Sequence, residues 1–269
     1  MPYSKKISRG NPGLIVLVLD DSGSMGDMMP GTSDPKYAWT ERCCGIIFQE
    51  LLARSTESSG TVVVKPRYFI LVIIYGGTPY VWGQGVMDIE QTVKKYTQDG
   101  NSLGLGGSHG GTDGAAALAE AHNVLAKAVT EERFKDSFPP MVFHLTDGMS
   151  HTDPTAEAEK ITKLTTADGN VLIVNAYIGT QTSLEYRGPQ DFQGYVDRDE
   201  AGPSVDNTVM FNMSSIAPDC ISHNLIEDGI FPNLRQGARL FFDVRTKEML
   251  KNVIQVVGSV GSRADREVR

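Results

Sequence analysis

The chain has 269 residues, with 25 lysines and arginines against 33 aspartates and glutamates, and a formal net charge of −8. Its 40% hydrophobic and 22% charged residues are ordinary for a globular protein, which excludes a long disordered or fibrous chain, and the length suits one large domain or two small ones. The negative net charge and the absence of a cluster of basic residues in the sequence argue against nucleic-acid binding. They fit a protein that binds cations or basic partners.

The first predicted element is a buried strand over residues 14–19, where leucine, isoleucine and valine follow one another without a break. Unbroken apolar runs of this length are typical of strands that are covered on both faces of a sheet. Later runs of the same kind predict strands over 68–75, 141–145, 171–178 and 239–244, and residues 80–82 predict a short edge strand.

Amphipathic segments lie between these runs. Apolar residues at helical spacing, together with capping residues and prolines in the first turn, predict helices over 35–54, 89–96, 113–129, 154–164 and 246–257. Residues 100–114 contain seven glycines, too many for a regular element, so this segment is predicted to be a loop.

Strands that alternate with helices predict βαβ crossovers. We therefore expect an α/β fold: a doubly wound, mostly parallel central sheet with helices on both faces. One domain is predicted over 13–260, with flexible tails at 1–12 and 261–269. The stretch 181–219 lacks clear periodicity and, at about 39 residues, is small for an independent core, so we interpret it as an insertion.

Three cysteines, Cys43, Cys44 and Cys220, form neither a disulfide framework nor the spacing of a zinc site. Reduced thiols in a cytoplasmic protein are the simplest interpretation, and the two cysteines on the first helix are expected to pack in the core. The apolar run at 14–19 is too short for a signal peptide or a membrane span. We predict a cytoplasmic protein without membrane contact.

Polar side chains follow two of the predicted strands and the glycine-rich loop. Asp20, Ser22 and Ser24 occupy alternate positions after the first strand, Thr112 follows the glycines, and Asp147 comes after the strand over 141–145. Ligands of parallel α/β sheets bind outside the carboxyl ends of the strands, so we expect these side chains to converge. Carboxylate and hydroxyl oxygens without histidine or cysteine favour Mg²⁺ or Mn²⁺.

This five-part pattern resembles the metal-ion-dependent adhesion site of von Willebrand factor A domains, in order and in placement at strand ends. The resemblance covers most of the predicted domain and is weakest over 181–219. Gly23-Ser24-Met25 is similar to the variants in bacterial and intracellular members, including tellurium-resistance-associated proteins of stress or defence systems.

The resemblance implies that Ser22 and Ser24 hold Mg²⁺ directly, with Thr112 joining directly or through water. Asp20 and Asp147 would act through bound waters and through hydrogen bonds to the hydroxyls. In family members an acidic side chain of a partner protein completes the coordination, so a protein partner offering an Asp or Glu is expected. The neighbouring carboxylates, Asp21 and Asp113, are interpreted as solvated or helix-capping residues.

Three functions remain open at this stage: a metal-dependent protein-binding module, a scaffold with a purely structural metal, and a Mg²⁺-dependent phosphohydrolase. The sequence does not support an enzymatic function. A haloacid-dehalogenase-type phosphatase needs an aspartate at the position that Ser22 occupies. The strand over 68–75 ends without the phospho-accepting aspartate of a receiver domain, and the glycine-rich loop has no phosphate-binding lysine. The binding module is therefore predicted, without catalysis, and the sequence leaves the oligomeric state open.

Overall fold

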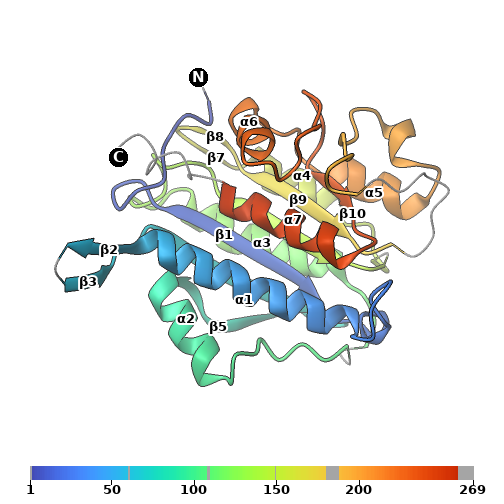
Figure 1. Cartoon of the computed structure of the whole chain (residues 1–269), viewed down its shortest axis with the longest axis horizontal. Helices are drawn as coiled ribbons and strands as arrows, with labels where there is room; N and C mark the ends of the chain where they lie inside the picture. Colours follow the sequence, from blue (N-terminus) through green and yellow to red (C-terminus); the bar gives the residue numbers. More distant parts are fainter. Residues whose placement is uncertain (1, 60, 108–109, 149, 180–187, 260–269) are drawn as a thin grey trace.

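The computed structural model describes residues 2–59, 61–107, 110–148, 150–179 and 188–259. Within them a six-stranded sheet has the order β10-β9-β6-β1-β4-β5 (Figure 1). Its strands are β1 (Gly13–Asp20), β4 (Tyr68–Tyr75), β5 (Tyr80–Asp88), β6 (Met141–Thr146), β9 (Leu172–Tyr177) and β10 (Phe241–Asp243). Neighbouring strands pair in parallel except for β5, which runs antiparallel to β4 at one edge. The predicted mostly parallel sheet is confirmed.

Helices cover both faces of this sheet. They are α1 (Lys36–Ser55), α2 (Ile89–Gln98), α3 (Gly114–Ala128), α4 (Thr155–Lys163), α5 (Val205–Met213), α6 (Asp219–Glu227) and α7 (Lys247–Ser259). The helices α1 and α7 lie side by side on one face, and α3 and α4 lie on the other (Figure 1). This arrangement confirms the doubly wound α/β fold.

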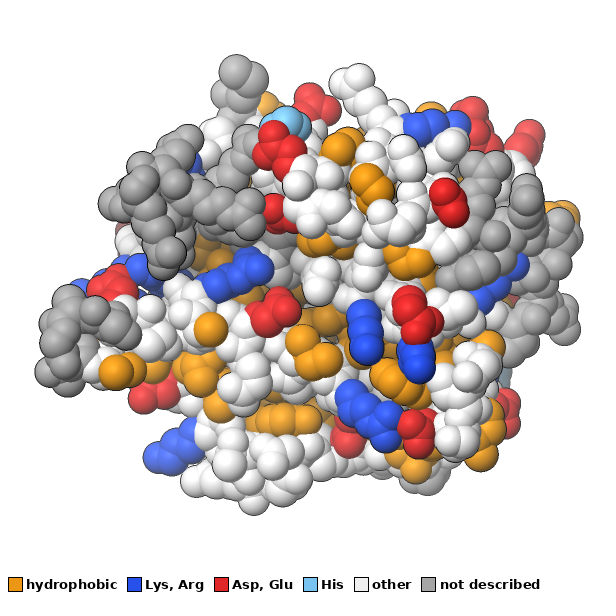
Figure 2. Space-filling view, viewed as in Figure 1, with side chains coloured by type: hydrophobic (Ala, Val, Ile, Leu, Met, Phe, Trp, Pro, Cys, Tyr) orange, Lys and Arg blue, Asp and Glu red, His pale blue; other side chains and the backbone are white. Residues whose placement is uncertain are grey.

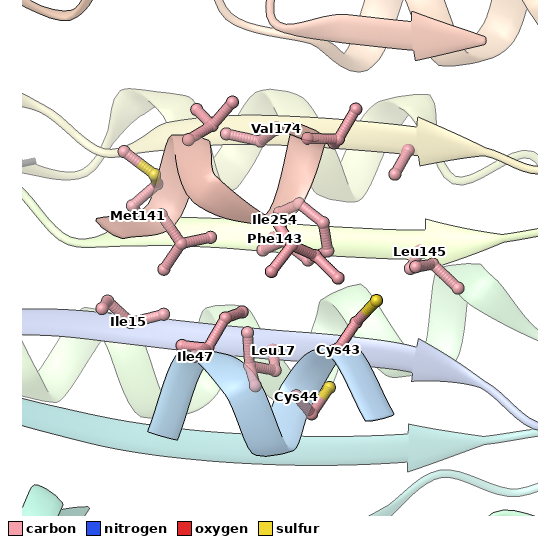
Figure 3. Packing of buried hydrophobic residues seen from close by; sticks show 14 of the residues in the cluster. Ile15, Leu17, Cys43, Cys44, Ile47, Met141, Phe143, Leu145, Val174 and Ile254 are labelled. Atoms are coloured by element: carbon pink, nitrogen blue, oxygen red, sulfur yellow. The ribbon is translucent and has the colours of Figure 1, made fainter. Parts of the chain in front are cut away.

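The core explains why the strand after the N-terminal segment is an unbroken apolar run. Every residue of β1 is buried, and alternate side chains face opposite layers: Leu17 packs in the cluster of α1 and α7, whereas Val18 packs in that of α3 and α4. Figure 3 shows Ile47 of α1 close to Leu17, and Ile254 of α7 close to Phe143. Burial on both faces requires hydrophobic residues at every position of the strand.

The cysteines of α1 lie in this core, as predicted. Cys43 and Cys44 are buried among the residues beneath α1. Burial raises the pKa of the Cys43 thiol to about 12, and it raises the pKa of Cys44 well above its usual range. Both thiols are therefore protonated and unreactive at neutral pH.

On the outer side of α1 and α7, acidic and basic side chains are interspersed (Figure 2). Trp39 of α1 lies between the two helices, with the Arg42 guanidinium 5.0 Å from its ring centroid and the ammonium groups of Lys247 and Lys251 each 5.8 Å from it. These cation–π contacts join α7 to α1 at the surface.

Several elements differ from the sequence-based expectation. Strand β5 extends over Tyr80–Asp88 rather than 80–82, because Gly83 and Gly85 adopt positive φ and interrupt the alternation of apolar residues while pairing with β4 continues. The hairpin of β2 (Thr56–Ser59) and β3 (Thr61–Val64) and the short pair β7 (Thr165–Thr166) and β8 (Gly169–Asn170) were not predicted. These strands are two to four residues long, too short to give the apolar run or alternation from which a strand is predicted.

The stretch predicted as an irregular insertion, 181–219, contains regular structure in its described part. A short 3-10 helix, η2 (Arg198–Ala201), precedes α5, which packs against β9 and β10 through buried Met210 and Phe211. No single apolar stripe marks α5, because Val205 is exposed and Asn207 is buried. Residues 181–187 of this stretch lie outside the described residues.

The segment predicted as an N-terminal tail makes contacts with the domain. The Asp168 carboxylate accepts the backbone N–H groups of Ser4 at 2.9 Å and of Lys5 at 3.0 Å, and Ile7 is buried. The predicted tail at 261–269 lies outside the described residues. No helix in the described part of the chain has the length and apolarity to cross a bilayer.

Candidate metal centre

The polar residues of the predicted site follow two adjacent parallel strands. Asp20 is the last residue of β1, and Asp147 directly follows β6. The register pairs Leu19 with Leu145, so the two carboxylates leave the sheet at the same edge. The carboxyl ends of parallel strands therefore place Asp20 and Asp147 together, as the sequence predicted.

Asp20 is fully buried and fixed by two donors. Its Oδ1 accepts the backbone N–H of Ser22 at 2.8 Å, and its Oδ2 accepts the Thr146 hydroxyl at 2.6 Å. Burial raises the pKa of Asp20, while the hydrogen bonds from Thr146 and Ser22 act against this rise. Sequence reasoning gave Thr146 no role, although its place at the end of the strand beside β1 was a usable signal.

The two serines are close enough to act together. A short 3-10 helix, η1 (Gly23–Gly26), follows Ser22 and turns the chain so that the hydroxyl oxygens of Ser22 and Ser24 lie 3.3 Å apart. Ser24 also donates to Asp147 Oδ1 at 2.7 Å. Adjacent ligands of an octahedral Mg²⁺ ion are about 3 Å apart, so this spacing fits two neighbouring coordination positions.

A lysine that the motif does not contain reaches the same carboxylate. The Lys36 ammonium donates to Asp147 Oδ2 at 2.7 Å and to the Ser24 carbonyl oxygen at 3.3 Å. The Lys36 side chain is 4% exposed, and that of Asp147 is fully buried. Sequence reasoning missed Lys36, because nothing but its position at the start of α1 distinguishes it from a surface lysine.

The glycine-rich loop is held against the site by two carboxylates, the buried Asp21 and the half-buried Glu41. Asp21 Oδ1 accepts the N–H groups of Gly106 at 2.8 Å and Gly107 at 2.6 Å, and Glu41 of α1 accepts the N–H groups of Leu103 and Leu105. The interpretation of Asp21 as a solvated or capping residue was wrong: the side chain is buried and binds the loop.

The loop contacts η1 two residues before Thr112. The Gly23 N–H donates to the Gly110 carbonyl at 3.3 Å, and the His151 N–H donates to the Thr112 carbonyl at 2.8 Å. Asp113 caps α3 by accepting the Ala116 N–H at 3.1 Å, as interpreted from the sequence. Among the described residues, no hydrogen bond joins the Thr112 side chain to Asp20 or to the other predicted ligands.

The donor set fits a small hard cation. Two carboxylates and the serine hydroxyls supply oxygen alone, and the described residues contain no group of three His, Cys, Asp or Glu side chains arranged to hold a metal. Asp20, Asp147 and Lys36 together leave one net negative charge at the site. The chemistry of these donors suits a hard divalent cation better than zinc, which prefers nitrogen and sulfur ligands.

Comparison with solved structures assigns the fold. The VWA domain of SpRpn10 aligns over 93% of this chain and 97% of its own, with a TM-score of 0.50 and 10% identity. A von Willebrand factor type A protein from Catenulispora acidiphila aligns over 93% of this chain, with a TM-score of 0.51 and 14% identity. The chain has a von Willebrand factor A fold.

At these identities, the comparison establishes the architecture of this von Willebrand factor A-like domain and no more. The domain spans 43% of the Catenulispora chain, and it spans 20% of a three-domain fragment of the pili tip protein Mfa5 from Porphyromonas gingivalis, matched at a TM-score of 0.36 and 17% identity. No family model matches the sequence, and no curated protein matches it either.

Proposed function

We propose that this von Willebrand factor A-like domain is a protein-binding module that depends on Mg²⁺ or Mn²⁺. Ser22 and Ser24 hold the ion directly, and Thr112 joins them directly or through water. Asp20 and Asp147 orient the hydroxyls and bound waters. The observation that carries this proposal is the pair of serine hydroxyls 3.3 Å apart, next to a carboxylate that accepts from Ser24.

Charge explains what kind of partner this site would take. Direct ligands that are neutral hydroxyls leave most of the field of a divalent cation uncompensated. Asp147 is already paired with Lys36, which reduces the negative charge near the ion further. The best remaining ligand is an anionic oxygen, so the partner presents an aspartate or glutamate side chain.

A binding role agrees with the state of the reactive groups nearby. The buried Cys43 and Cys44 thiols lie in the core beneath α1, and His144 is buried with its pKa lowered to about 4 by desolvation. His144 is also engaged by Tyr75 and Asn175 on its two nitrogens. These groups are unsuited to general-base or nucleophilic catalysis.

The setting that we propose is cytoplasmic and bacterial, in a stress or defence system such as tellurium resistance. It rests on the similarity of Gly23-Ser24-Met25 to intracellular members of the family. The partner protein is expected to come from the same system.

Titration of Mg²⁺ into chelator-treated protein tests the metal site by calorimetry. The parent domain is expected to bind one ion, and Ser22→Ala is expected to lose this binding because a direct ligand is removed. Thr97→Ala, which removes an exposed hydroxyl on α2, is the matched control and should bind as the parent does. Equal binding by Ser22→Ala and the parent would show that the serine pair does not hold the ion.

Affinity capture from a lysate, in Mg²⁺ and in chelator, then separates the candidate functions. A captured partner that is lost both in chelator and with Ser22→Ala supports the binding module, provided that replacing one partner carboxylate abolishes the complex. Capture that is unchanged in chelator favours the scaffold with a structural metal. Phosphate release that disappears in Asp147→Ala would favour the phosphohydrolase.

A further inference from the structure

Lys36 places a buried positive charge at the edge of the proposed metal site. Its ammonium lies 2.7 Å from Asp147 Oδ2, 3.3 Å from the Ser24 carbonyl oxygen and 3.9 Å from Asp27 Oδ2. A lysine side chain is rarely buried, and burial of its charge requires a partner of opposite charge. Of the two carboxylates near the ammonium, Asp147 is buried, whereas the Asp27 side chain is 74% exposed.

The backbone holds Lys36 in this position. It is the first residue of α1, its N–H donates to the Asp27 carbonyl at 2.9 Å, and its carbonyl accepts the Thr40 hydroxyl at 3.1 Å. A cation at the N-terminus of a helix is unfavourable, because the helix dipole is positive there. The location of Lys36 is therefore explained by its contact with Asp147 rather than by helix stability.

Two buried carboxylates close together need a cation. Asp20 accepts the Ser22 N–H at 2.8 Å and Asp147 accepts the Ser24 hydroxyl at 2.7 Å, so two like charges flank the same serine pair and repel each other. The Lys36 ammonium offsets this repulsion in the absence of a metal. When a divalent ion is bound, the same ammonium repels the ion and holds Asp147 Oδ2 through a hydrogen bond.

We propose that Lys36 is an internal competitor of the divalent cation: it neutralises Asp147 when the site has no metal, and it weakens metal affinity. This inference rests on the proposed function, because it concerns the same cation site. It follows that the domain stays folded without metal, and that the concentration at which Mg²⁺ loads is set by a residue outside the serine–aspartate motif.

The test compares Lys36→Met, which keeps an unbranched apolar side chain without the charge, with the parent. In calorimetric titration with Mg²⁺, removal of the neighbouring charge should tighten binding by at least about tenfold. In chelator the melting temperature of Lys36→Met should fall below that of the parent, and Mg²⁺ should raise it by more than it raises the parent. Lys163→Met, at a lysine whose side chain is 76% exposed beside Glu159, is the control.

Each outcome bears on one of the two proposals. Equal or weaker Mg²⁺ binding by Lys36→Met, while Ser22→Ala abolishes binding, overturns the role of Lys36 and leaves the metal site intact. Absence of Mg²⁺ and Mn²⁺ binding in the parent and in Lys36→Met overturns both. Mg²⁺ binding by Lys36→Met but not by the parent supports the inference that Lys36 competes with the metal ion. If Lys36→Met is unfolded in chelator, refolding on addition of Mg²⁺ supports the inference, and Lys36→Gln provides the affinity measurement.

Discussion

The Tyr75 hydroxyl lies 2.7 Å from His144 Nε2, and this contact joins β4 and β6, the two strands that flank β1. His144 Nδ1 lies 2.8 Å from Asn175 Oδ1 on β9, while Asn175 Nδ2 donates to the Ser214 hydroxyl oxygen at 2.9 Å. Because the amide oxygen of Asn175 accepts, Nδ1 of His144 carries the proton and Nε2 accepts from Tyr75. A neutral histidine therefore completes a polar network inside the sheet.

The first prediction concerns the pH dependence of stability. Burial lowers the pKa of His144 to about 4, so the unfolded chain binds a proton between pH 6.5 and 4 that the folded protein does not bind. The stability contributed by neutral His144 is fully present above pH 6.5 and is lost as the pH falls toward 4, by about 3 kcal/mol. Urea unfolding at pH 7, 6 and 5 measures this loss.

His144→Gln provides the comparison for this prediction. Its side chain does not titrate, so its free energy of unfolding should be lower than that of the parent at pH 7 and should change less between pH 7 and 5. Equal slopes for the two proteins over this range would contradict the assignment of the pH dependence to His144.

The sequence predicted those parts of the fold and site that depend on local pattern. Strands such as β1 were predicted because burial on both faces needs an unbroken apolar run. Asp20 and Asp147 were singled out as candidate site residues because each comes at the end of such a run. The roles of Thr146 and Lys36 were missed because they depend on contacts with residues more than a hundred positions away. Helix α5 was missed because its burial comes from contacts with β9 and β10 rather than from one apolar stripe.

The second prediction concerns the attachment of the glycine-rich loop. Asp21→Ala leaves the N–H groups of Gly106 and Gly107 without their acceptor, which is 2.8 and 2.6 Å away in the parent. Loss of two hydrogen bonds to a buried charged group should lower the free energy of unfolding by about 2–4 kcal/mol. Chemical denaturation measures this change, and hydrogen exchange should become faster at Gly106 and Gly107.

Asp21→Asn tests whether the hydrogen bonds or the charge matter for the loop. The amide oxygen can still accept both N–H groups, so the loss of stability should be smaller than in Asp21→Ala. A loss of the same size in both variants would show that the carboxylate charge, rather than acceptance by one oxygen, holds the loop.

The third prediction compares two glycines of this loop. Both have positive φ, of +62° at Gly107 and +82° at Gly104, but a Cβ at Gly107 would lie 2.5 Å from the backbone nitrogen of Gly26, whereas Gly104 faces open space. Gly104→Ala should cost about 1–2 kcal/mol from backbone strain alone. Gly107→Ala should cost clearly more and weaken Mg²⁺ binding, because the loop has to move away from η1. Denaturation and calorimetry on both variants test this, and equal costs would be the contradicting result.

The fourth prediction concerns metal identity. A site of serine hydroxyls and carboxylates should take Mg²⁺ or Mn²⁺ in preference to Zn²⁺. Chelator-treated protein reloaded with each metal should show the larger thermal shift with Mg²⁺ and Mn²⁺. Metal analysis of the purified protein provides the second measurement, and tightly held stoichiometric zinc would contradict the oxygen-ligand site.

The last prediction concerns the hydroxyl of Thr146, which supplies Asp20 Oδ2 with a hydrogen bond of 2.6 Å. Thr146→Val keeps the shape of the side chain and removes the donor, so the buried carboxylate loses one of the hydrogen bonds that oppose the rise of its pKa on burial. The free energy of unfolding should fall by about 1.5–3 kcal/mol, the usual range for a hydrogen bond to a charged group. The Mg²⁺ affinity should fall as well, because Asp20 then no longer keeps one orientation beside Ser22.

Thr146→Ser separates the hydrogen bond from the packing of the methyl group. It keeps the donor and removes only the methyl, so its Mg²⁺ affinity should stay near that of the parent while its stability falls slightly. Denaturation and calorimetric titration on both variants provide the measurements. If Thr146→Val binds Mg²⁺ as tightly as Thr146→Ser does, the orientation of Asp20 by Thr146 does not contribute to the metal site, and the role of this residue is confined to the stability of the sheet edge.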